Sequence, residues 1–198
     1  KNKLYFIGYG HMAEAIYQRL DKSLFENICL IEKDDDRRIS IDKKKHGKTQ
    51  LLKSLQGIKF CNSDIVILAV KPNQIKSICN EINSLIIEKK DLPVVISIAA
   101  GVTTTSIKDY IIQENLSQLQ KFLNIYRAMP NLCASNGDSI TGLFGSSVSD
   151  ITNSKNTVSE IFNSVGEILW VKKEADLNII TAISGSGPAY IFYIMEEM

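Results

Sequence analysis

Over residues 1–172, short uninterrupted apolar runs alternate with stretches whose apolar residues recur at helical spacing. Uninterrupted runs are typical of parallel strands buried on both faces, and the helical stretches are typical of helices packed on a sheet. Helices are predicted over residues 13–20, 75–86 and 158–165. Strands are predicted at residues 4–7, 28–31, 65–70, 94–98, 122–127, 140–144 and 168–171. This order predicts an α/β fold with a mostly parallel sheet.

The pattern changes near the end of the chain. From Glu174 onward only helical spacing remains, and Ile191, Ile194 and Met198 still follow it at the last residue. We therefore expect two domains: residues 1–172 with the sheet, and residues 173–198 as the beginning of an all-helical domain that continues past Met198. At the other end, the chain enters its first strand at once, which leaves no room for a signal peptide.

A glycine-rich turn, Gly8-x-Gly10-x-x-Ala13, joins the first predicted strand to the first predicted helix. Gly8 permits a tight turn, Gly10 lets the backbone approach a pyrophosphate, and Ala13 allows close packing of the helix on the strand. The N-terminus of the helix then offers N–H groups and a positive dipole end to phosphates. The turn predicts an N-terminal Rossmann-like domain that binds a dinucleotide.

The end of the second predicted strand gives opposing indications about which dinucleotide is bound. Glu32 lies where an acidic side chain hydrogen-bonds the ribose 2′-hydroxyl of NAD. Lys33, Arg37 and Arg38 follow directly and offer cations to the 2′-phosphate of NADP. Both NADH and NADPH stay open, and the clustered cations tip the balance slightly toward NADPH.

Two more turns close predicted strands with small or rigid residues, Ala69–Pro72 and Ser97–Gly101. Pro72 forces the chain to turn at the edge of the sheet where ligands bind. Ala99 and Ala100 leave room for a flat ring, although close packing alone would also account for them.

Near the end of the chain, Gly187 and Pro188 predict the opening of a helix with Ser186 as its N-cap. The N–H groups of such an opening can bind a carboxylate. A capped turn without a ligand is the alternative. Arg127 is equally open, since it suits a phosphate, a substrate or a structural ion pair.

Composition excludes several classes of function. A net charge of +1, from 23 basic and 22 acidic residues, gives no overall attraction to nucleic acid or to a membrane surface. No apolar run is long enough to cross a bilayer. The four cysteines form no CxxC pair and have no histidine at metal-ligand spacing, so we expect no metal site, reduced thiols and a cytoplasmic protein.

Five segments together resemble pyrroline-5-carboxylate reductase, and the resemblance spans essentially the whole chain. That enzyme catalyses the last step of proline biosynthesis by transferring hydride from NAD(P)H to the C=N carbon of 1-pyrroline-5-carboxylate. The last two segments are the most specific. The segments are Ile7–Met12, Ala69–Pro72, Ser97–Gly101, Arg127–Asn131 and Ser184–Tyr190.

The resemblance implies a role for each of these segments. The residues implied to bind the cofactor are Ile7, Gly8, Tyr9, Gly10, His11, Met12, Glu32, Lys33, Gln56, Ala69, Val70, Lys71, Pro72, Ile98, Ala99 and Ala100. The residues implied to bind the substrate are Ser184, Ser186, Gly187 and Pro188. The catalytic group is unknown: Thr181 and Ser186 are candidate hydroxyls, and the main hydroxyl donor is expected beyond Met198, in a Ser-Pro-Gly-Gly-Thr-like segment.

The resemblance also implies a homodimer or higher oligomer formed through the C-terminal helices. Residues 1–198 alone are then expected to bind cofactor with little or no turnover. Two other functions remain open: a different Rossmann reductase of the β-hydroxyacid dehydrogenase type, and a nucleotide-binding fragment without catalysis.

Overall fold

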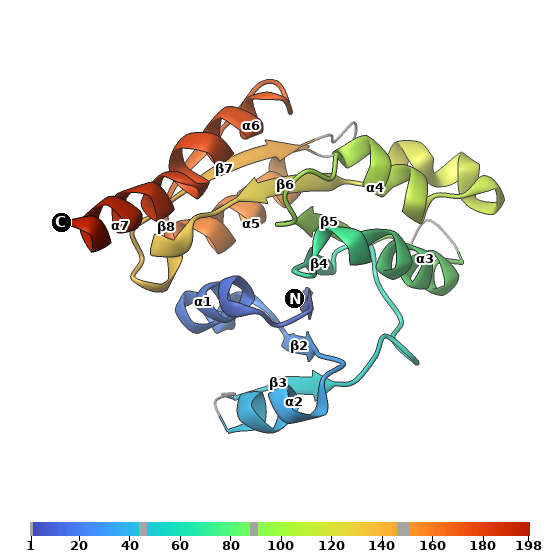
Figure 1. Cartoon of the computed structure of the whole chain (residues 1–198). Coiled ribbons are helices and arrows are strands. Elements are labelled where there is room, and N and C mark those ends of the chain that lie inside the picture. The colour runs from blue at the N-terminus through green and yellow to red at the C-terminus, as the bar shows by residue number, and fades with distance from the viewer. Residues whose placement is uncertain (1, 44–46, 88–90, 146–150) are drawn as a thin grey trace.

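A single eight-stranded sheet forms the centre of the computed structural model, which describes residues 2–43, 47–87, 91–145 and 151–198 (Figure 1). The strand order is β3-β2-β1-β4-β5-β6-β7-β8, and within the described residues only the β6–β7 pair is antiparallel. The strands are β1 (Lys3–Ile7), β2 (Asn27–Ile31), β3 (Thr49–Leu52), β4 (Ile65–Leu68), β5 (Val94–Ser97), β6 (Ile125–Met129), β7 (Ser139–Gly145) and β8 (Gly166–Trp170). The prediction of an α/β fold with a mostly parallel sheet is confirmed.

Helices cover both faces of the sheet. The helices are α1 (His11–Arg19), α2 (Asp35–Asp42), α3 (Ile75–Leu85), α4 (Thr104–Ile111) and α5 (Ile151–Asn163). Residues of α1 and α5 share one hydrophobic core, and residues of α3 and α4 share the other. Successive residues of a strand point to opposite faces, so Leu4 and Phe6 join the first core and Tyr5 and Ile7 the second.

Some predicted strand boundaries differ from the structure. The strand predicted at residues 122–127 begins only at Ile125, because Glu114–Phe122 form the short helical segment η4. The strand predicted at residues 65–70 ends at Leu68. β3 has no counterpart among the predictions, since it lies at the sheet edge and only Thr49 of its four residues is buried. An edge strand that is half exposed lacks the apolar run that marks a buried one.

The connection between β6 and β7 explains their antiparallel pairing. A parallel return needs a crossover of a dozen or more residues, whereas this connection holds only the short helical segment η5 (Leu132–Ser135) and a turn at Gly137. Gly137 has φ +87°, and the Arg19 guanidinium of α1 lies against it. Arg19 also donates hydrogen bonds to the carbonyls of Ser135 and Asn136, so α1 supports this hairpin.

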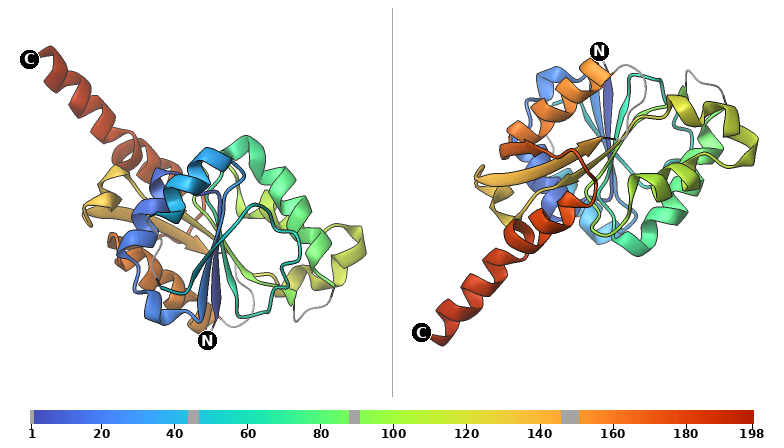
Figure 2. Two further views of the ribbon diagram at one scale, coloured as in Figure 1. Left: turned by 90° about the horizontal axis from the view of Figure 1, so that it is seen from below. Right: turned by 90° about the horizontal axis from the view of Figure 1, so that it is seen from above.

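The chain ends in one long helix that projects away from the sheet (Figure 2). It comprises α6 (Asp176–Ile180), the π-helical turn η6 (Thr181–Gly185) and α7 (Gly187–Glu197). No uninterrupted apolar run long enough to cross a bilayer is expected from the sequence; by length and mean composition alone, the 22-residue helix Asp176–Glu197 is nevertheless long and apolar enough to cross a membrane. Most of this helix is exposed, including Tyr190, Ile191 and Met195.

Candidate dinucleotide site and the helical segment beside it

The glycine turn lies at the carboxyl edge of the sheet, between β1 and α1. Gly8 has φ +83°, and a Cβ there would lie 2.7 Å from Val70 Cγ1 and 2.8 Å from the Ala69 carbonyl oxygen. No other residue type fits that combination of backbone angle and contact. Gly10 differs, because it has an ordinary φ of −79° and no neighbouring atom within 4 Å of the place that a Cβ would take. The open space beside Gly10 is where a pyrophosphate would approach the start of α1.

A cavity of about 370 Å³ opens beside this turn. Nine of the sixteen residues predicted to bind the cofactor line it: Ile7, Gly8, Tyr9, Gly10, Glu32, Lys33, Ala69, Val70 and Lys71. Arg37, one of the cations that the sequence offered to a 2′-phosphate, also lines the cavity. The lining further includes residues that the sequence did not single out: Ile31, Asp34, Gln74, Ser77 and Ile78. Gln74, Ser77 and Ile78 belong to the turn and helix after β4, where only tertiary structure turns them toward the site.

Glu32 is fixed at the far end of this cavity by backbone donors. Its carboxylate accepts hydrogen bonds from Tyr9 N at 3.3 Å and from Asp34 N at 3.1 Å. The nearby cations already have partners. Lys33 pairs with Glu81 at 3.1 Å, and Arg37 donates to the Tyr9 carbonyl at 2.8 Å. Arg38 donates to the carbonyls of Glu32 and Lys33 and pairs with Asp35, outside the cavity lining.

Tyr9 packs into the core beneath the turn. Its ring makes edge contacts with Phe6 and Tyr17, and the side chain is buried. Burial raises the pKa of the Tyr9 phenol well above its usual range, and the Glu14 carboxylate and Tyr17 add to the rise. Tyr9 is therefore neutral at physiological pH and contributes packing rather than proton transfer.

The remaining predicted cofactor residues do not line this cavity. His11 and Met12 form the first turn of α1, and Pro72 begins the short helical segment η2 (Pro72–Gln74). Ile98, Ala99 and Ala100 follow β5, where Ile98 N donates to the Leu68 carbonyl and Ala99 N to Ser97 Oγ.

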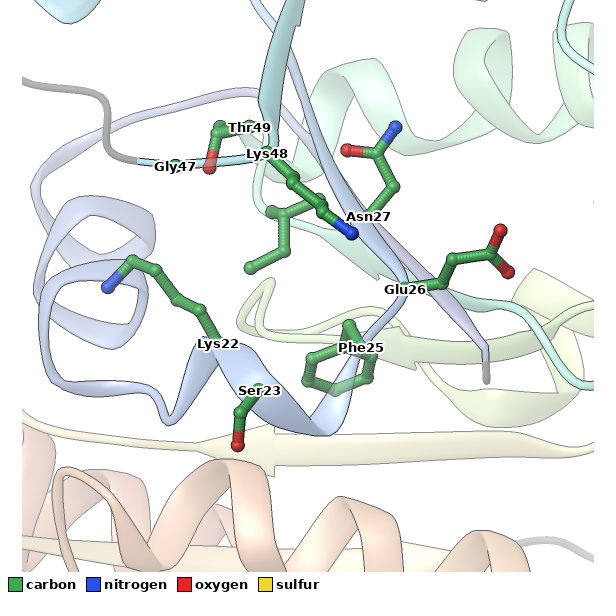
Figure 3. A pocket seen from close by; sticks show the side chains of 9 residues that line it. Lys22, Ser23, Phe25, Glu26, Asn27, Gly47, Lys48 and Thr49 are labelled. Atoms are coloured by element: carbon green, nitrogen blue, oxygen red, sulfur yellow. The ribbon is translucent and has the colours of Figure 1, made fainter.

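Gln56 lies apart from the glycine turn. It lines a different cavity, of about 430 Å³, together with Tyr5 and Cys29. The structure does not bring Gln56 to the glycine turn. Another cavity, of about 370 Å³, lies at the amino ends of β2 and β3 between Lys22, Phe25 and Lys48, and contains no predicted site residue (Figure 3). In the described ranges, no three His, Cys, Asp or Glu residues are grouped as metal ligands would be.

The two most specific motifs meet through their side chains. Asn131 Nδ2, just after β6, donates to Ser184 Oγ at 2.7 Å, and Ser184 Oγ lies 3.4 Å from the Ile140 carbonyl of β7. The Thr181 hydroxyl donates to the Leu177 carbonyl at 2.7 Å, within its own helix. Thr181 therefore already uses its hydroxyl proton, whereas Ser184 joins the helical segment to the sheet.

The predicted helix start at Gly187 is confirmed in position, since α7 begins there with Pro188 in its first turn, but the predicted side-chain cap is absent. Ser186 has helical angles and makes no side-chain cap, and its N–H bonds to the Thr181 carbonyl at 2.9 Å. This five-residue spacing is that of a π-helical turn, which is common at functional sites. Pro188 has no N–H to donate, and the wider turn before it accommodates that loss inside a continuous helix. The start of α7 thus follows a π-helical turn directly and has no side-chain cap.

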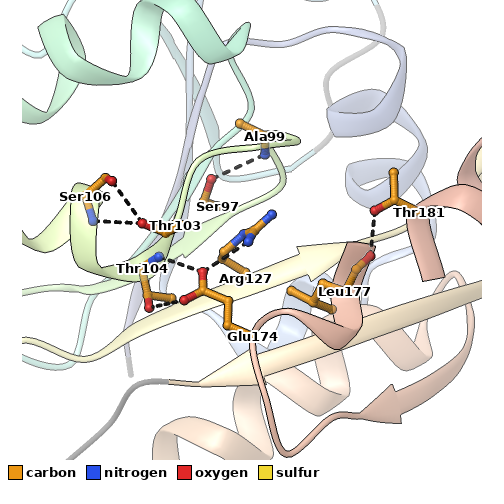
Figure 4. Close-up of polar contacts among 9 residues, drawn as sticks. All are labelled: Ser97, Ala99, Thr103, Thr104, Ser106, Arg127, Glu174, Leu177 and Thr181. Carbon is orange, nitrogen blue, oxygen red and sulfur yellow. Dashed lines mark hydrogen bonds and ion pairs between the residues drawn. The ribbon is translucent and has the colours of Figure 1, made fainter. Parts of the chain in front are cut away.

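The first turn of this helix is seated on the sheet by close packing and by an ion pair. A Cβ at Gly142 of β7 would lie 2.7 Å from Ile180 and 3.0 Å from the fully buried Leu177. Beside it, Arg127 Nη1 lies 3.0 Å from Glu174 Oε1, which answers the question left open for Arg127 (Figure 4). Thr104 N and Oγ1 donate to the same carboxylate at 2.7 and 2.8 Å.

Comparison with known proteins places this site in the class of dinucleotide-dependent oxidoreductases. Residues 3–101 match the family model described as NADP oxidoreductase coenzyme F420-dependent. Residues 174–198 match the model described as pyrroline-5-carboxylate reductase dimerisation. The pyrroline-5-carboxylate reductase of Staphylococcus epidermidis is 33% identical over 198 residues, which cover 98% of this chain and 68% of that protein. The chain belongs to the pyrroline-5-carboxylate reductase family.

Solved structures agree with this assignment. The Coxiella burnetii pyrroline-5-carboxylate reductase is 37% identical, with a TM-score of 0.79 over 98% of this chain and 67% of that one. The Plasmodium falciparum pyrroline carboxylate reductase, solved with NADP bound, is 25% identical, with a TM-score of 0.71 over 98% of this chain and 66% of that one. The chain thus spans about two thirds of the length of these relatives. A 3-hydroxyisobutyrate dehydrogenase from Salmonella typhimurium shares the fold alone, at 12% identity and a TM-score of 0.57 over 86% of this chain and 56% of that one.

Proposed function

We propose that this protein reduces 1-pyrroline-5-carboxylate to proline with NAD(P)H. The observation that carries the proposal is the 2.7 Å hydrogen bond between Asn131 and Ser184. It joins the two motifs most specific to the family, in a sheet whose glycine turn opens onto the cavity suited to a dinucleotide. A shared fold without that contact would support only nucleotide binding.

The described residues supply binding and alignment. The Gly8–Gly10 turn and the start of α1 bind the pyrophosphate through N–H groups and the helix dipole. The Ile98–Ala100 turn supports the flat ring, and the helix around Ser184, Gly187 and Pro188 forms one wall for the substrate. When bound, NAD(P)H supplies the hydride. Because a protonated imine is already a good hydride acceptor, the protein contributes mainly orientation and exclusion of water.

The contacts at the ribose end favour NADH over NADPH, which shifts the balance drawn from sequence alone. Lys33 pairs with Glu81, Arg38 with Asp35, and Arg37 with both the Tyr9 carbonyl and Glu32, while the Glu32 carboxylate lines the cavity where it would accept a hydrogen bond from a ribose 2′-hydroxyl. We predict that Glu32→Ala weakens NADH binding about tenfold, the value of one charge-assisted hydrogen bond of about 1.5 kcal/mol, and strengthens NADPH binding. Titration of each cofactor by its fluorescence measures both constants, with exposed Glu167→Gln as control. Equal losses for both cofactors would contradict this assignment.

The proposed function also implies a domain organisation, a mode of association and a cellular location for this protein. Residues 1–172 are the dinucleotide-binding domain and residues 173–198 belong to the helical domain through which copies associate. The exposed apolar helix is covered by a second copy rather than by lipid, and no nucleic acid is bound. The four free cysteines suit a reducing, cytoplasmic location.

The test is an assay of the natural-length protein for oxidation of NADH or NADPH that depends on added 1-pyrroline-5-carboxylate, with proline identified as product. Cofactor oxidation that does not respond to this imine would reject the proposal. Turnover of a β-hydroxyacid would instead favour the other reductase class, and cofactor binding without any turnover a nucleotide-binding module. Residues 1–198 alone are expected to bind cofactor with little or no turnover.

A further inference from the structure

Three segments that are distant in sequence meet at the Glu174 carboxylate. Arg127 comes from β6, Thr104 from the first turn of α4, and Glu174 from the connection between β8 and α6. The carboxylate accepts three hydrogen bonds, at 3.0, 2.7 and 2.8 Å. Glu174 thus ties the start of the helical segment to two elements of the sheet domain at once.

Arg127 is almost completely buried, with 3% of its surface exposed. Its Nε has no hydrogen-bond partner among the described residues, and Glu174 is its ion-pair partner there. A buried guanidinium held by one carboxylate has little freedom to shift, because any movement leaves the charge without compensation. The contact is therefore a fixed point rather than a loose surface pair.

The location of this fixed point connects both halves of the site. Arg127 is paired across the sheet with Ser97, whose Oγ accepts the N–H of Ala99 in the turn proposed to support the nicotinamide. Glu174 lies two residues before α6, which carries Leu177 (Figure 4) and whose continuation carries Ser184 and Pro188. The contact thus runs from the turn that holds the ring to the helix that forms the substrate wall.

We propose that Glu174 is a positioning residue: held by Arg127 and Thr104, it sets the placement of the substrate-binding helix over the Ile98–Ala100 turn and so aligns the imine carbon with the nicotinamide. This inference rests on the proposed function. It predicts that loss of the contact impairs hydride transfer while the cofactor Kd changes little, because the pyrophosphate and ribose contacts of the dinucleotide lie after β1, β2 and β4.

The test compares Glu174→Gln with wild type in the natural-length protein. Gln keeps one oxygen for Thr104 but removes the charge that holds Arg127. Glu167→Gln is the matched control. It replaces the same carboxylate by the same amide, but at an exposed position on β8 outside the Glu174 contact. If Glu174→Gln does not fold, Arg127→Lys tests the same contact from the other side.

The expected result is a fall of at least tenfold in kcat with a raised KM for the imine, and a cofactor Kd within twofold of wild type. The kinetic isotope effect with 4-deuterated cofactor should rise, because misalignment makes hydride transfer more fully rate-limiting. A smaller active fraction alone would lower kcat and leave KM and the isotope effect unchanged, and that result would overturn the proposal. Wild-type protein without imine-dependent turnover would instead overturn the proposed function, and this inference with it.

Discussion

Single residues in the glycine turn have separable roles. Gly8 is required by the backbone, with φ +83° and a neighbouring carbonyl 2.8 Å from the Cβ position, whereas the space beside Gly10 is open. The sequence motif predicts different roles for them, a tight turn at Gly8 and the approach of a pyrophosphate at Gly10. Their backbone surroundings differ in the way those roles require, because only Gly8 of the two has a positive φ and only Gly10 has open space beside it.

Gly10→Ala should therefore separate folding from binding. We predict a change of less than about 1 kcal/mol in the free energy of unfolding, since Ala adopts this backbone conformation and meets no atom. The dinucleotide Kd should rise at least about tenfold, because the new methyl group occupies the approach of the pyrophosphate. Denaturant unfolding and cofactor titration measure the two quantities. Gly8→Ala is the control, and it should lose both stability and dinucleotide affinity. An unchanged dinucleotide Kd in Gly10→Ala would contradict the placement of the pyrophosphate beside Gly10.

The buried thiol of Cys79 predicts a dependence of stability on pH. Burial raises the pKa of Cys79 from 9.0 to about 12. The unfolded chain therefore loses this proton first, and the contribution is intact below pH 9 and is lost as the pH rises toward 12. Between pH 9 and 10 the free energy of unfolding should fall by about 1 kcal/mol from this group.

Cys79→Val provides the comparison for that pH dependence. The variant should show a shallower decline of the free energy of unfolding over the same range, measured by urea denaturation. Cys29, whose pKa is also raised by burial, accounts for a remaining slope. Identical slopes in the two proteins would show that Cys79 is accessible to ionisation in the folded state.

At the scale of elements, the β7–β8 pair depends on a glycine that no motif marked. Gly166 begins β8 with φ +144°, and a Cβ there would lie 2.0 Å from the Ser139 carbonyl oxygen. Gly166→Ala should cost more than about 3 kcal/mol, since it combines backbone strain with a clash against backbone that cannot move aside. Gly101→Ala is a matched control, with φ +76° in open space, and should cost about 1–2 kcal/mol. Thermal and denaturant unfolding measure the loss of stability in each variant. Equal losses of free energy of unfolding in Gly166→Ala and Gly101→Ala would mean that a shift of β8 relieves the clash.

The terminal helix is the element that sequence reasoning described least well. Its π-helical turn places Thr181 and Ser186 in a hydrogen bond, and this arrangement depends on the register of backbone donors rather than on a side-chain pattern. The seating of α6 on Gly142 depends on strand β7, which lies far away in sequence. Neither contact can be recognised from the sequence pattern around the residues that form it.

On the scale of the whole molecule, the exposed apolar helix predicts association. Ile191 and Met195 are four residues apart on α7 and more than half exposed, which is unfavourable unless another surface covers them. In the natural-length protein, Ile191→Glu with Met195→Glu should lower the molar mass measured by sedimentation velocity to that of a smaller assembly or a monomer. Glu197→Lys, also on α7, is the control and should leave the mass unchanged. An unchanged mass in the double variant would place the interface elsewhere.

The sequence by itself determined the alternation of strands and helices, the glycine turn and the family, because each of these is recorded in local spacing and in motifs. Tertiary structure decided the edge position of β3, the cavity residues Gln74 and Ser77, the separation of Gln56 from the turn, and the continuity of the helix through Pro188. It also decided that Arg127 pairs with Glu174. The physical reason is that periodicity reports which side of an element is buried, whereas pairing between distant segments depends on the three-dimensional path of the chain.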